Sequence, residues 1–488
     1  MFMLKRIFSR IMAVEPIQRQ SIISFVWKIA LTLIGLLSTI YFARTVGAEI
    51  LGAYFLFMAY FGIVNLVSDG GFGGAAIKRI SEGEEQNEYF SAFVAVRSIF
   101  VTLVIVSLFL FQDLFMNLND AGVFNWLLVA LIGSLMYGTV NSAIAGRGKV
   151  GIQSTCGFIN EVTRIFVQVL AVFLGYGVAG LAGGLVIGMI VASIIELRFL
   201  DLQLARFTWH HMKSLSTFSF WLFLTASGSM VYSYADTVMI GYFMNNSDVG
   251  VYRVVLQFTS IAALATTSLY ATLWPKVSRW GKIGEIRSIE NSLSKAMIYG
   301  LLFPIPICVG GVLLGDKLLY YFYGAEFANG YSVLIVLIIV QIISVFQHFF
   351  LTYLSALDMQ KNAFKVTSIS ATINIVLNAA LIPMIGILGA AIATFVTIAV
   401  NAILAQRVLS KTMAIKFRYE SFYNILKASL AMGLIVGGYR LLVPLSSIWS
   451  ALIPVVLGGM VYGALVLKLD NNIYEELKTM IIKMMGHG

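Results

Sequence analysis

Long apolar segments, each ended by a short polar patch, recur along the whole chain. Each is about 20 residues long, the length that an α-helix needs to cross the hydrocarbon core of a bilayer. A membrane β-barrel would instead show shorter segments of alternating hydrophobicity. The pattern therefore predicts an all-α integral membrane protein. Fourteen spans are predicted, at 21–43, 50–68, 90–111, 124–145, 152–174, 179–200, 215–241, 250–274, 296–315, 331–355, 363–383, 386–406, 421–442 and 447–467.

The composition leaves little of the chain outside a membrane. Hydrophobic residues make up 59% of the 488 residues and charged residues 11%, whereas a soluble domain carries about 25% charged residues. The longest polar gaps, 69–89, 201–214 and 276–295, are too short for a soluble catalytic domain, which needs about 40 residues or more. Cys156 and Cys308 fall in separate spans and predict neither a disulfide framework nor a metal site.

Basic residues fall in alternate loops. Of the 33 Lys and Arg residues, twenty-five lie on one predicted side, three on the other (Arg44, Lys317 and Arg440) and five inside spans. Short cytoplasmic loops of membrane proteins carry this excess of cations. The bias predicts a multi-pass protein of the plasma (inner) membrane, with both termini in the cytoplasm. The net charge of +10 is thus an orientation signal and does not indicate nucleic-acid binding.

Three pairs of short motifs repeat about six spans apart, which predicts two six-helix lobes of the same orientation, related by an axis along the membrane normal. The pairs are Gly52–Tyr54 with Gly250–Tyr252, Gly177–Ala182 with Gly386–Ala391, and Ala145–Lys149 with Ala356–Lys361. The predicted domains are a cytoplasmic N-terminal segment (1–20), an N-lobe (21–200), a cytoplasmic inter-lobe linker (201–214), a C-lobe (215–406), two appended spans (421–467) and a cytoplasmic tail (468–488).

Six ionisable residues inside otherwise apolar spans are singled out: Lys28, Arg97, Glu161, Arg164, Asp236 and Arg253. The fifth cation within a span, Lys427, lies near the predicted cytoplasmic end of an appended span and is interpreted as an anchor. A charge at the centre of a bilayer costs about 3 kcal/mol or more, so such residues face a bundle interior, a wet cavity or one another. Four of the six are cations. The sequence therefore indicates a cationic interior through which an anion passes.

Each of these residues also has a purely structural interpretation. Arg164 and Glu161 are three residues apart on one helical face, and fit either a packing ion pair or a cavity cation with a counter-ion or ion-coupling carboxylate. Lys28 and Arg97 each lie about 10 Å into a span and either face the cavity or extend to the interface. The sequence alone leaves these alternatives open.

Other polar residues form a second set of candidates. Asp236 and Arg253 form either a hairpin salt bridge or an opposing-charge gate at the outer mouth, and Asp236 is also a candidate for ion coupling. Arg44 is placed at the same outer boundary. Asn374 and Asn378, four residues apart, fit either sugar binding or a bond between helices.

The segment Ala43–Tyr54 resembles the start of Wzx-type polysaccharide flippases of the multidrug/oligosaccharidyl-lipid/polysaccharide exporter superfamily. Asp236–Gly241 followed by Gly250–Tyr252 is similar to the matching signature at the seventh and eighth helices, and Gly386–Ala391 to the turn before the twelfth. The resemblance covers about residues 20–470. It implies a V-shaped, two-lobed fold and translocation of a glycan linked to a polyprenyl pyrophosphate.

The predicted function is therefore a flippase that moves a lipid-linked oligosaccharide by alternating access, with Lys28, Arg97 and Arg164 holding the pyrophosphate. Alternatives are a lipid II-type flippase, a cation-coupled drug or metabolite antiporter, and a membrane glycan polymerase, for which the outer loops are short. No cofactor, metal or nucleotide site is predicted. The predicted partners are the lipid-linked oligosaccharide, the bilayer, H⁺ or Na⁺, and polysaccharide-assembly proteins.

Overall fold

The computed structural model describes residues 16–476 and 478, and these residues fold into helices joined by short connections. Residues 1–15 of the predicted N-terminal segment, and 477 and 479–488 of the predicted tail, lie outside the described residues. Contacts between residues divide the chain into two compact units, Met1–Gly250 and Val251–Gly488. The division falls after the seventh predicted span, whereas the sequence places the lobe boundary before it. The predicted lobes therefore stay a prediction.

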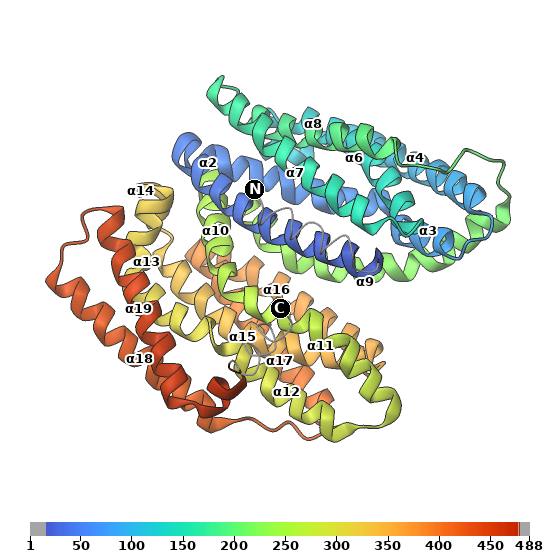
Figure 1. The fold of residues 1–488 in the computed structure, drawn as a ribbon. Coiled ribbons are helices and arrows are strands. Elements are labelled where there is room, and N and C mark those ends of the chain that lie inside the picture. Colours follow the sequence, from blue (N-terminus) through green and yellow to red (C-terminus); the bar gives the residue numbers. More distant parts are fainter. Residues whose placement is uncertain (1–15, 477, 479–488) are drawn as a thin grey trace, which may run out of the picture. The chain divides into compact units, whose positions relative to one another are not determined.

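The first unit is built from long helices packed side by side. Its elements are α2 (Pro16–Asp69), α3 (Phe72–Ser81), α4 (Gln86–Leu110), η1 (Gln112–Phe115), α5 (Met116–Asp120), α6 (Phe124–Gly146), α7 (Val150–Phe173), α8 (Gly177–Leu197) and α9 (Trp209–Phe243). α7 and α8 form a close hairpin (Figure 1). Glycines make this approach possible, because a Cβ at Gly184 would overlap Gln168 Cγ and one at Gly188 would lie 2.7 Å from the Asn160 carbonyl oxygen.

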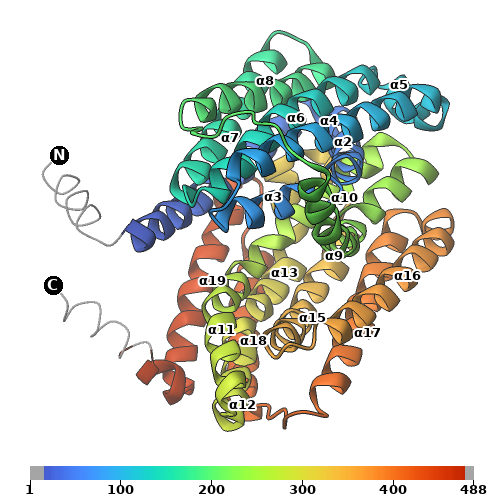
Figure 2. The ribbon, with the colours of Figure 1, turned by 90° about the vertical axis from the view of Figure 1, so that its right-hand side faces the viewer.

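α10 (Asn246–Thr259) begins at the end of the first unit and continues into the second. The further elements are η2 (Ser260–Ala263), α11 (Leu264–Ile283), α12 (Ile286–Leu301), α13 (Pro304–Tyr323), α14 (Ala325–Ala328), α15 (Tyr331–Ala356), α16 (Gln360–Ile385), α17 (Ile387–Leu409), α18 (Tyr419–Leu442) and α19 (Ile448–Leu469). α16 and α17 run side by side (Figure 2). The predicted appended spans are α18 and α19, which pack on each other and on α13.

The all-α membrane fold predicted from the sequence is confirmed. Among the described residues, eleven helices are long and apolar enough to cross a membrane. One of them, within α2, covers the first two predicted spans, and its backbone leaves helical geometry at Gly47, with φ 76°. A positive φ suits glycine because it has no Cβ to clash with the backbone. The number of fourteen spans stays a prediction.

Two of the repeated motifs adopt matching backbone conformations. In the Ala145–Lys149 and Ala356–Lys361 turns, Gly148 and Asp358 both have positive φ, 72° and 60°. In the Gly177 and Gly386 motifs, the first glycine has φ 51° and 64°. Each of these motifs lies between two consecutive helices, and the helices that follow one another at Gly177 and Gly386 pack closely. The motif pairs therefore correspond in local structure as well as in sequence.

The third motif pair lies at a very close helix contact. A Cβ on Gly52 in α2 would overlap the carbonyl oxygen of Asn246, and a Cβ on Gly250 would overlap the carbonyl oxygen of Ala48. Both obstacles are backbone atoms, which cannot rotate away. Only glycine fits at either position.

We expect Gly52→Ala to destabilise the protein by about 3 kcal/mol or more, because forcing extra atoms into a packed site shifts the backbone. The thermal midpoint of the purified protein in detergent should fall clearly. Gly35→Ala, on the same helix but with no atom within 4 Å of the added Cβ, is the matched control and should leave the midpoint unchanged or raise it. An equal midpoint for both variants would contradict the contact.

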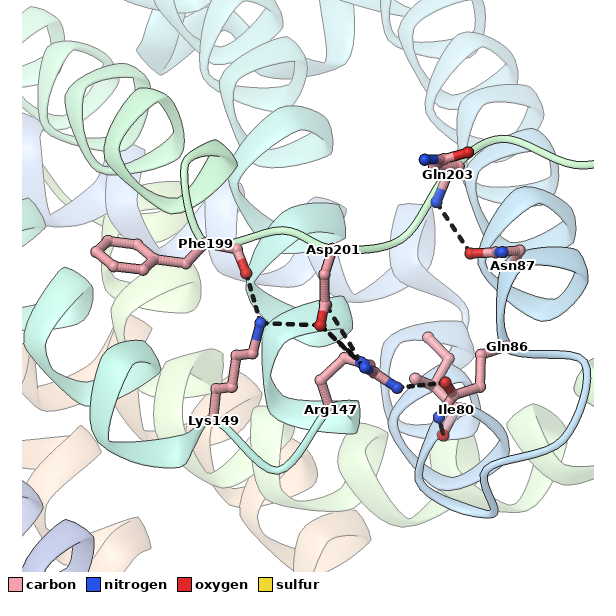
Figure 3. A network of polar contacts seen from close by, with 8 residues as sticks. All are labelled: Ile80, Gln86, Asn87, Arg147, Lys149, Phe199, Asp201 and Gln203. Carbon is pink, nitrogen blue, oxygen red and sulfur yellow. Dashed lines mark hydrogen bonds and ion pairs between the residues drawn. The ribbon is translucent and has the colours of Figure 1, made fainter.

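The connection from α8 to α9 is an extended segment attached to the first unit (Figure 3). Arg147 Nη2 lies 2.9 Å and Lys149 Nζ 3.1 Å from Asp201 Oδ2. Lys149 Nζ also donates to the Phe199 carbonyl oxygen at 2.8 Å, and the backbone N–H of Gln203 donates to Asn87 Oδ1 at 2.9 Å. The first residues of the predicted inter-lobe linker 201–214 are thus an extended strap, held to the helices of the first unit by these bonds. From Trp209 onward the linker is helical and belongs to α9.

The charge of Asp201 makes this strap sensitive to acid. Its hydrogen bonds from Arg147 lower the pKa of the Asp201 carboxyl from 3.8 to about 2. A depressed carboxyl pKa stabilises the attached state above about pH 4, and this contribution is lost as the pH falls toward 2. The protection of the amides of residues 198–208, relative to their intrinsic exchange rate at the same pH, should therefore fall in acid, and at neutral pH in Arg147→Ala. Arg198→Ala, an exposed cation at the start of the segment, is the control. Equal exchange in both variants would refute the attachment.

Candidate functional site

α7 carries a polar stripe through an otherwise apolar helix. Gln153, Asn160, Glu161, Arg164 and Gln168 follow one another at spacings of seven, one, three and four residues, which place them on one side of the helix. At 1.5 Å per residue the stripe extends over about 22 Å. A polar stripe of this length in a membrane-spanning helix faces other protein or water, because lipid cannot satisfy its hydrogen-bonding groups.

The predicted pair of Arg164 and Glu161 forms an ion pair in the middle of this stripe. Arg164 Nη2 lies 2.5 Å from Glu161 Oε2, and their side chains are 19% and 34% exposed. Arg164 also interacts with the hydroxyl of Tyr54 on α2. Its Nε is buried without a hydrogen-bond partner among the described residues. Glu161 thus neutralises the charge at Nη2 of the guanidinium, while the N–H group at Nε is left free to donate a hydrogen bond.

Gln168 ties the stripe to two neighbouring helices. Its Nε2 donates to the Tyr54 hydroxyl at 2.9 Å and to the Leu181 carbonyl oxygen at 2.7 Å. This gives the tyrosine of the Gly52–Tyr54 motif a physical role, since Tyr54 orients both Gln168 and Arg164. Arg164 is therefore positioned by α2 as well as by its own helix.

Lys28 is exposed on α2, next to a residue that anchors α2 on α7. Trp27 Nε1 donates to Thr155 Oγ1 at 3.2 Å, and its ring stacks on Phe158 with centroids 4.0 Å apart. Lys28 thus lies close to α7, near the N-terminal half of that helix. That it faces the cavity stays a prediction.

Arg97 is placed differently from Arg164, because it is buried within the first unit at 3% exposure. Its Nη2 donates to the Ser134 carbonyl oxygen at 3.0 Å, and its Nη1 lies 3.5 Å from Asp69 Oδ1. The guanidinium lies over Gly138, where a Cβ would leave it no room. These contacts form an internal ion pair that joins α4, α6 and the end of α2, a different arrangement from the cavity-facing and interface positions that the sequence left open.

The remaining candidates occupy several places. Asp236 is buried on α9 in the first unit, Arg253 is half-buried on α10 in the second, and Arg44 is exposed on α2. Asn374 and Asn378 are buried on α16, where Asn378 Nδ2 donates to Asn374 Oδ1 at 3.1 Å. This bond lies within one helix, so it is not the bond between helices that was the structural alternative, and both interpretations of the asparagines stay untested. The roles of all five residues stay predictions.

Sequence reasoning missed Glu196 on α8, which is fully buried at 0% exposure. Its Oε1 accepts from Asn141 Nδ2 at 2.7 Å, and Gln153 of the stripe donates to Asn141 Oδ1 at 2.9 Å. Its Oε2 has no hydrogen-bond partner among the described residues. Glu196 could have been found from the sequence, because it is an ionisable residue inside the predicted span 179–200. The six candidate residues were selected by the same criterion.

The described residues contain no group of three or more His, Cys, Asp or Glu side chains arranged to hold a metal ion. The features found are instead apolar helices long enough to span a bilayer and a polar, partly charged stripe among them. Helices of this kind with ionisable groups between them define a polytopic membrane transporter.

Comparisons with known proteins place the chain more closely. Residues 17–280 match the family model described as polysaccharide biosynthesis protein, and residues 222–380 match the MatE family model. The chain is 30% identical to the probable low-salt glycan biosynthesis flippase Agl15 of Haloferax volcanii, over 92% of this chain and 95% of that protein. It is 25% identical to the probable flippase AglR of the same organism, over 96% and 99%.

Among solved structures, the lipid II flippase MurJ in an inward closed conformation has a TM-score of 0.78 at 19% identity, over 93% of this chain and 99% of that chain. This likeness concerns the fold. Together with the family match, it means that the chain belongs to the polysaccharide biosynthesis protein family, within the exporter superfamily that the sequence motifs predicted. Its relatives are named flippases, so the protein is a transporter and not an enzyme.

Proposed function

We propose that this protein moves a polyprenyl-pyrophosphate-linked oligosaccharide from the cytoplasmic to the outer leaflet by alternating access, for the synthesis of a surface glycan. The observation that carries the proposal is Arg164, a partly exposed guanidinium with unused donor capacity on the polar stripe of a spanning helix. A pyrophosphate and a sugar head cannot cross hydrocarbon unaided. Fixed cations and polar side chains replace their lost hydration while the polyprenyl tail stays in lipid.

Two cations are assigned to the substrate. Arg164 presents a planar fork of donors that fits phosphate oxygens, and Lys28 supplies a mobile point charge. Arg97 is assigned to packing because it is 3% exposed and contacts Asp69 and Ser134, although its Nε, like that of Arg164, has no hydrogen-bond partner among the described residues. Of the three cations that the sequence predicted to hold the pyrophosphate, Lys28 and Arg164 therefore remain in the proposal.

Coupling to an ion is assigned to three acids, of which Asp236 and Glu196 are buried and Glu161 is partly exposed. Glu161 neutralises Arg164 and is a candidate for a counter-ion that moves when substrate binds, while Asp236 on α9 stays a second candidate. Glu196 joins them. A buried carboxyl without a cation partner is costly to ionise, and it is therefore suited to binding a proton.

The proposal is tested with the purified chain in proteoliposomes that carry a polyprenyl-pyrophosphate oligosaccharide with a labelled sugar. Flipping is scored as the fraction of label that becomes accessible to a membrane-impermeant reagent. Accessibility should rise with the wild-type chain and stay at the protein-free level when Lys28 and Arg164 are both replaced by Ala. Equal rates for the wild-type chain and the double variant would remove these cations from the mechanism.

A cation-coupled drug or metabolite antiporter is the second candidate, favoured by the match of residues 222–380 to the MatE family model. Cells that overproduce the chain would then survive higher concentrations of cationic drugs. Unchanged drug susceptibility, combined with flipping in proteoliposomes, would leave the flippase as the function.

We further propose that the protein resides in the plasma membrane with both termini in the cytoplasm. The excess of basic residues in alternate loops supports this orientation. Reporters fused after Lys213 or Lys282 should report the cytoplasm, and reporters after Leu118 or Asn246 the exterior. A cytoplasmic signal from the last two would reverse the assignment.

A further inference from the structure

A pocket of about 490 Å³ in the first unit combines cationic, hydroxyl and aromatic side chains. Its polar lining comes from Arg79 on α3 and from His210, Lys213, Ser214 and Thr217 on α9. Its aromatic lining comes from Phe218 and Trp221, further along the same helix. None of these residues belongs to the stripe on α7.

The pocket follows from helix spacing and from a glycine contact. Positions 210, 213, 214, 217 and 221 are three to four residues apart and therefore share one face of α9. A Cβ at Gly71 would overlap the Ser219 carbonyl oxygen, and one at Gly74 would lie 2.7 Å from Leu222 Cδ1. These two glycines hold α3 tightly against α9, so that the basic end of α3 reaches the pocket.

The charge balance of the pocket is positive. Lys213 is exposed, and Lys78 Nζ lies 4.1 Å from the centroid of the Phe218 ring. Arg79 Nη1 pairs with Glu82 at 2.9 Å, yet its Nε is buried without a hydrogen-bond partner among the described residues. The other nearby acid, Glu85, lies against His211 behind the pocket rather than in its lining.

The side chains change character along α9. The cationic and hydroxyl groups come first, at the end that the basic loops place in the cytoplasm, and the aromatic groups follow toward the predicted span 215–241. Trp221 is 67% exposed. Exposed Trp at this position is typical of a membrane–water interface. A ligand that matches both ends has an anionic headgroup and an apolar tail.

We propose that this pocket binds the phosphate groups of the polyprenyl carrier lipid at the cytoplasmic surface, as a docking site separate from the translocation path. Lys213 and Arg79 hold the phosphate oxygens, Ser214 donates a hydroxyl hydrogen bond, and the tail lies along Phe218 and Trp221. The hydroxyl of Thr217 donates to the Lys213 carbonyl oxygen at 2.9 Å and only lines the pocket. The inference rests on the proposed function for the identity of the lipid, while the pocket itself does not depend on it.

The test measures lipid binding to the full chain in nanodiscs of phosphatidylcholine, by native mass spectrometry. The probes are polyprenyl pyrophosphate, phosphatidylglycerol and inorganic pyrophosphate. We expect polyprenyl pyrophosphate to bind most tightly, and Lys213→Gln combined with Arg79→Gln to weaken it about tenfold or more, since each variant removes a charge-assisted bond. Lys282→Gln, an exposed cation on α11, should bind as the wild-type chain does.

Three results would overturn the inference: unchanged binding in the Lys213 and Arg79 variant, equally tight binding of phosphatidylglycerol, or equally tight binding of inorganic pyrophosphate. Ser214→Ala, which removes the hydroxyl donor, adds a second test and should also weaken binding of the polyprenyl lipid. Flipping by the same proteins is scored separately. Pocket variants that bind lipid normally while the wild-type chain flips would overturn only the docking site, whereas lipid binding without flipping would overturn only the proposed function.

Discussion

Replacing Arg164 with alanine should abolish surface glycan while the protein stays in the membrane at its normal level. On the proposed function, the variant loses the charge-assisted contacts of Arg164 to the pyrophosphate. Removing one partner of such a contact costs about 3 kcal/mol, or a hundredfold in transport. Surface polysaccharide and the lipid-linked precursor at the cytoplasmic side would be measured together. Lys427→Ala, an exposed cation on α18, is the matched control and should leave both unchanged.

Two further variants separate a substrate contact from a packing ion pair. Arg164→Gln together with Glu161→Gln removes both charges of the pair and leaves no buried charge uncompensated. A packing pair would tolerate this change, whereas a substrate cation would not. Arg164→Lys should keep part of the activity if charge alone suffices and lose it if two parallel bonds to phosphate are needed. Normal export by the double Gln variant would assign Arg164 to packing.

Glu196→Gln should stop transport or remove its dependence on pH without unfolding the protein. The amide has the shape of the protonated carboxyl and keeps the acceptor for Asn141 Nδ2, so the fold should be retained. It cannot release a proton. The groups facing Glu196 are Tyr137 and Asn141 of α6 and Cys156 of α7, none of them a cation.

Flipping by this variant would be measured in proteoliposomes over a series of pH values, with and without a proton gradient. Glu84→Gln, an exposed acid before α4, controls for loss of a negative charge and should behave as the wild-type chain does. A Glu196→Gln protein that flips at the normal rate with the normal pH profile would assign Glu196 to packing alone.

The membrane fold was predictable because a span of about 20 apolar residues has one stable structure in lipid, a helix that satisfies its own backbone. Helix ends outside the membrane were not predictable in this way. α9 begins at Trp209 and α12 at Ile286, well before the apolar spans 215–241 and 296–315. In water, polar residues continue a helix as readily as apolar residues do, so hydropathy gives no boundary there.

The candidate site was predictable only where partners share a helix. Arg164 and Glu161, three residues apart, meet as their spacing indicates. Arg97 instead pairs with Asp69 from another helix, and periodicity within one helix carries no information about such a partner. Glu196 was overlooked because it lies close to the basic end of its span, beside Arg198, where charge is expected.

The contact between Gly52 and Gly250 bears on the ancestry of the chain. These glycines are 198 residues apart, and so are Ala48 and Asn246. In the repeat, Gly250 is equivalent to Gly52 and Asn246 is equivalent to Ala48. Gly52 approaches Asn246 while Gly250 approaches Ala48, so the same contact is made twice with the two repeats exchanged. Such reciprocity is the signature of an isologous, two-fold interface between identical subunits. The contact has the form expected if a symmetric homodimer of a half-length ancestor was later fused into one polypeptide by gene duplication.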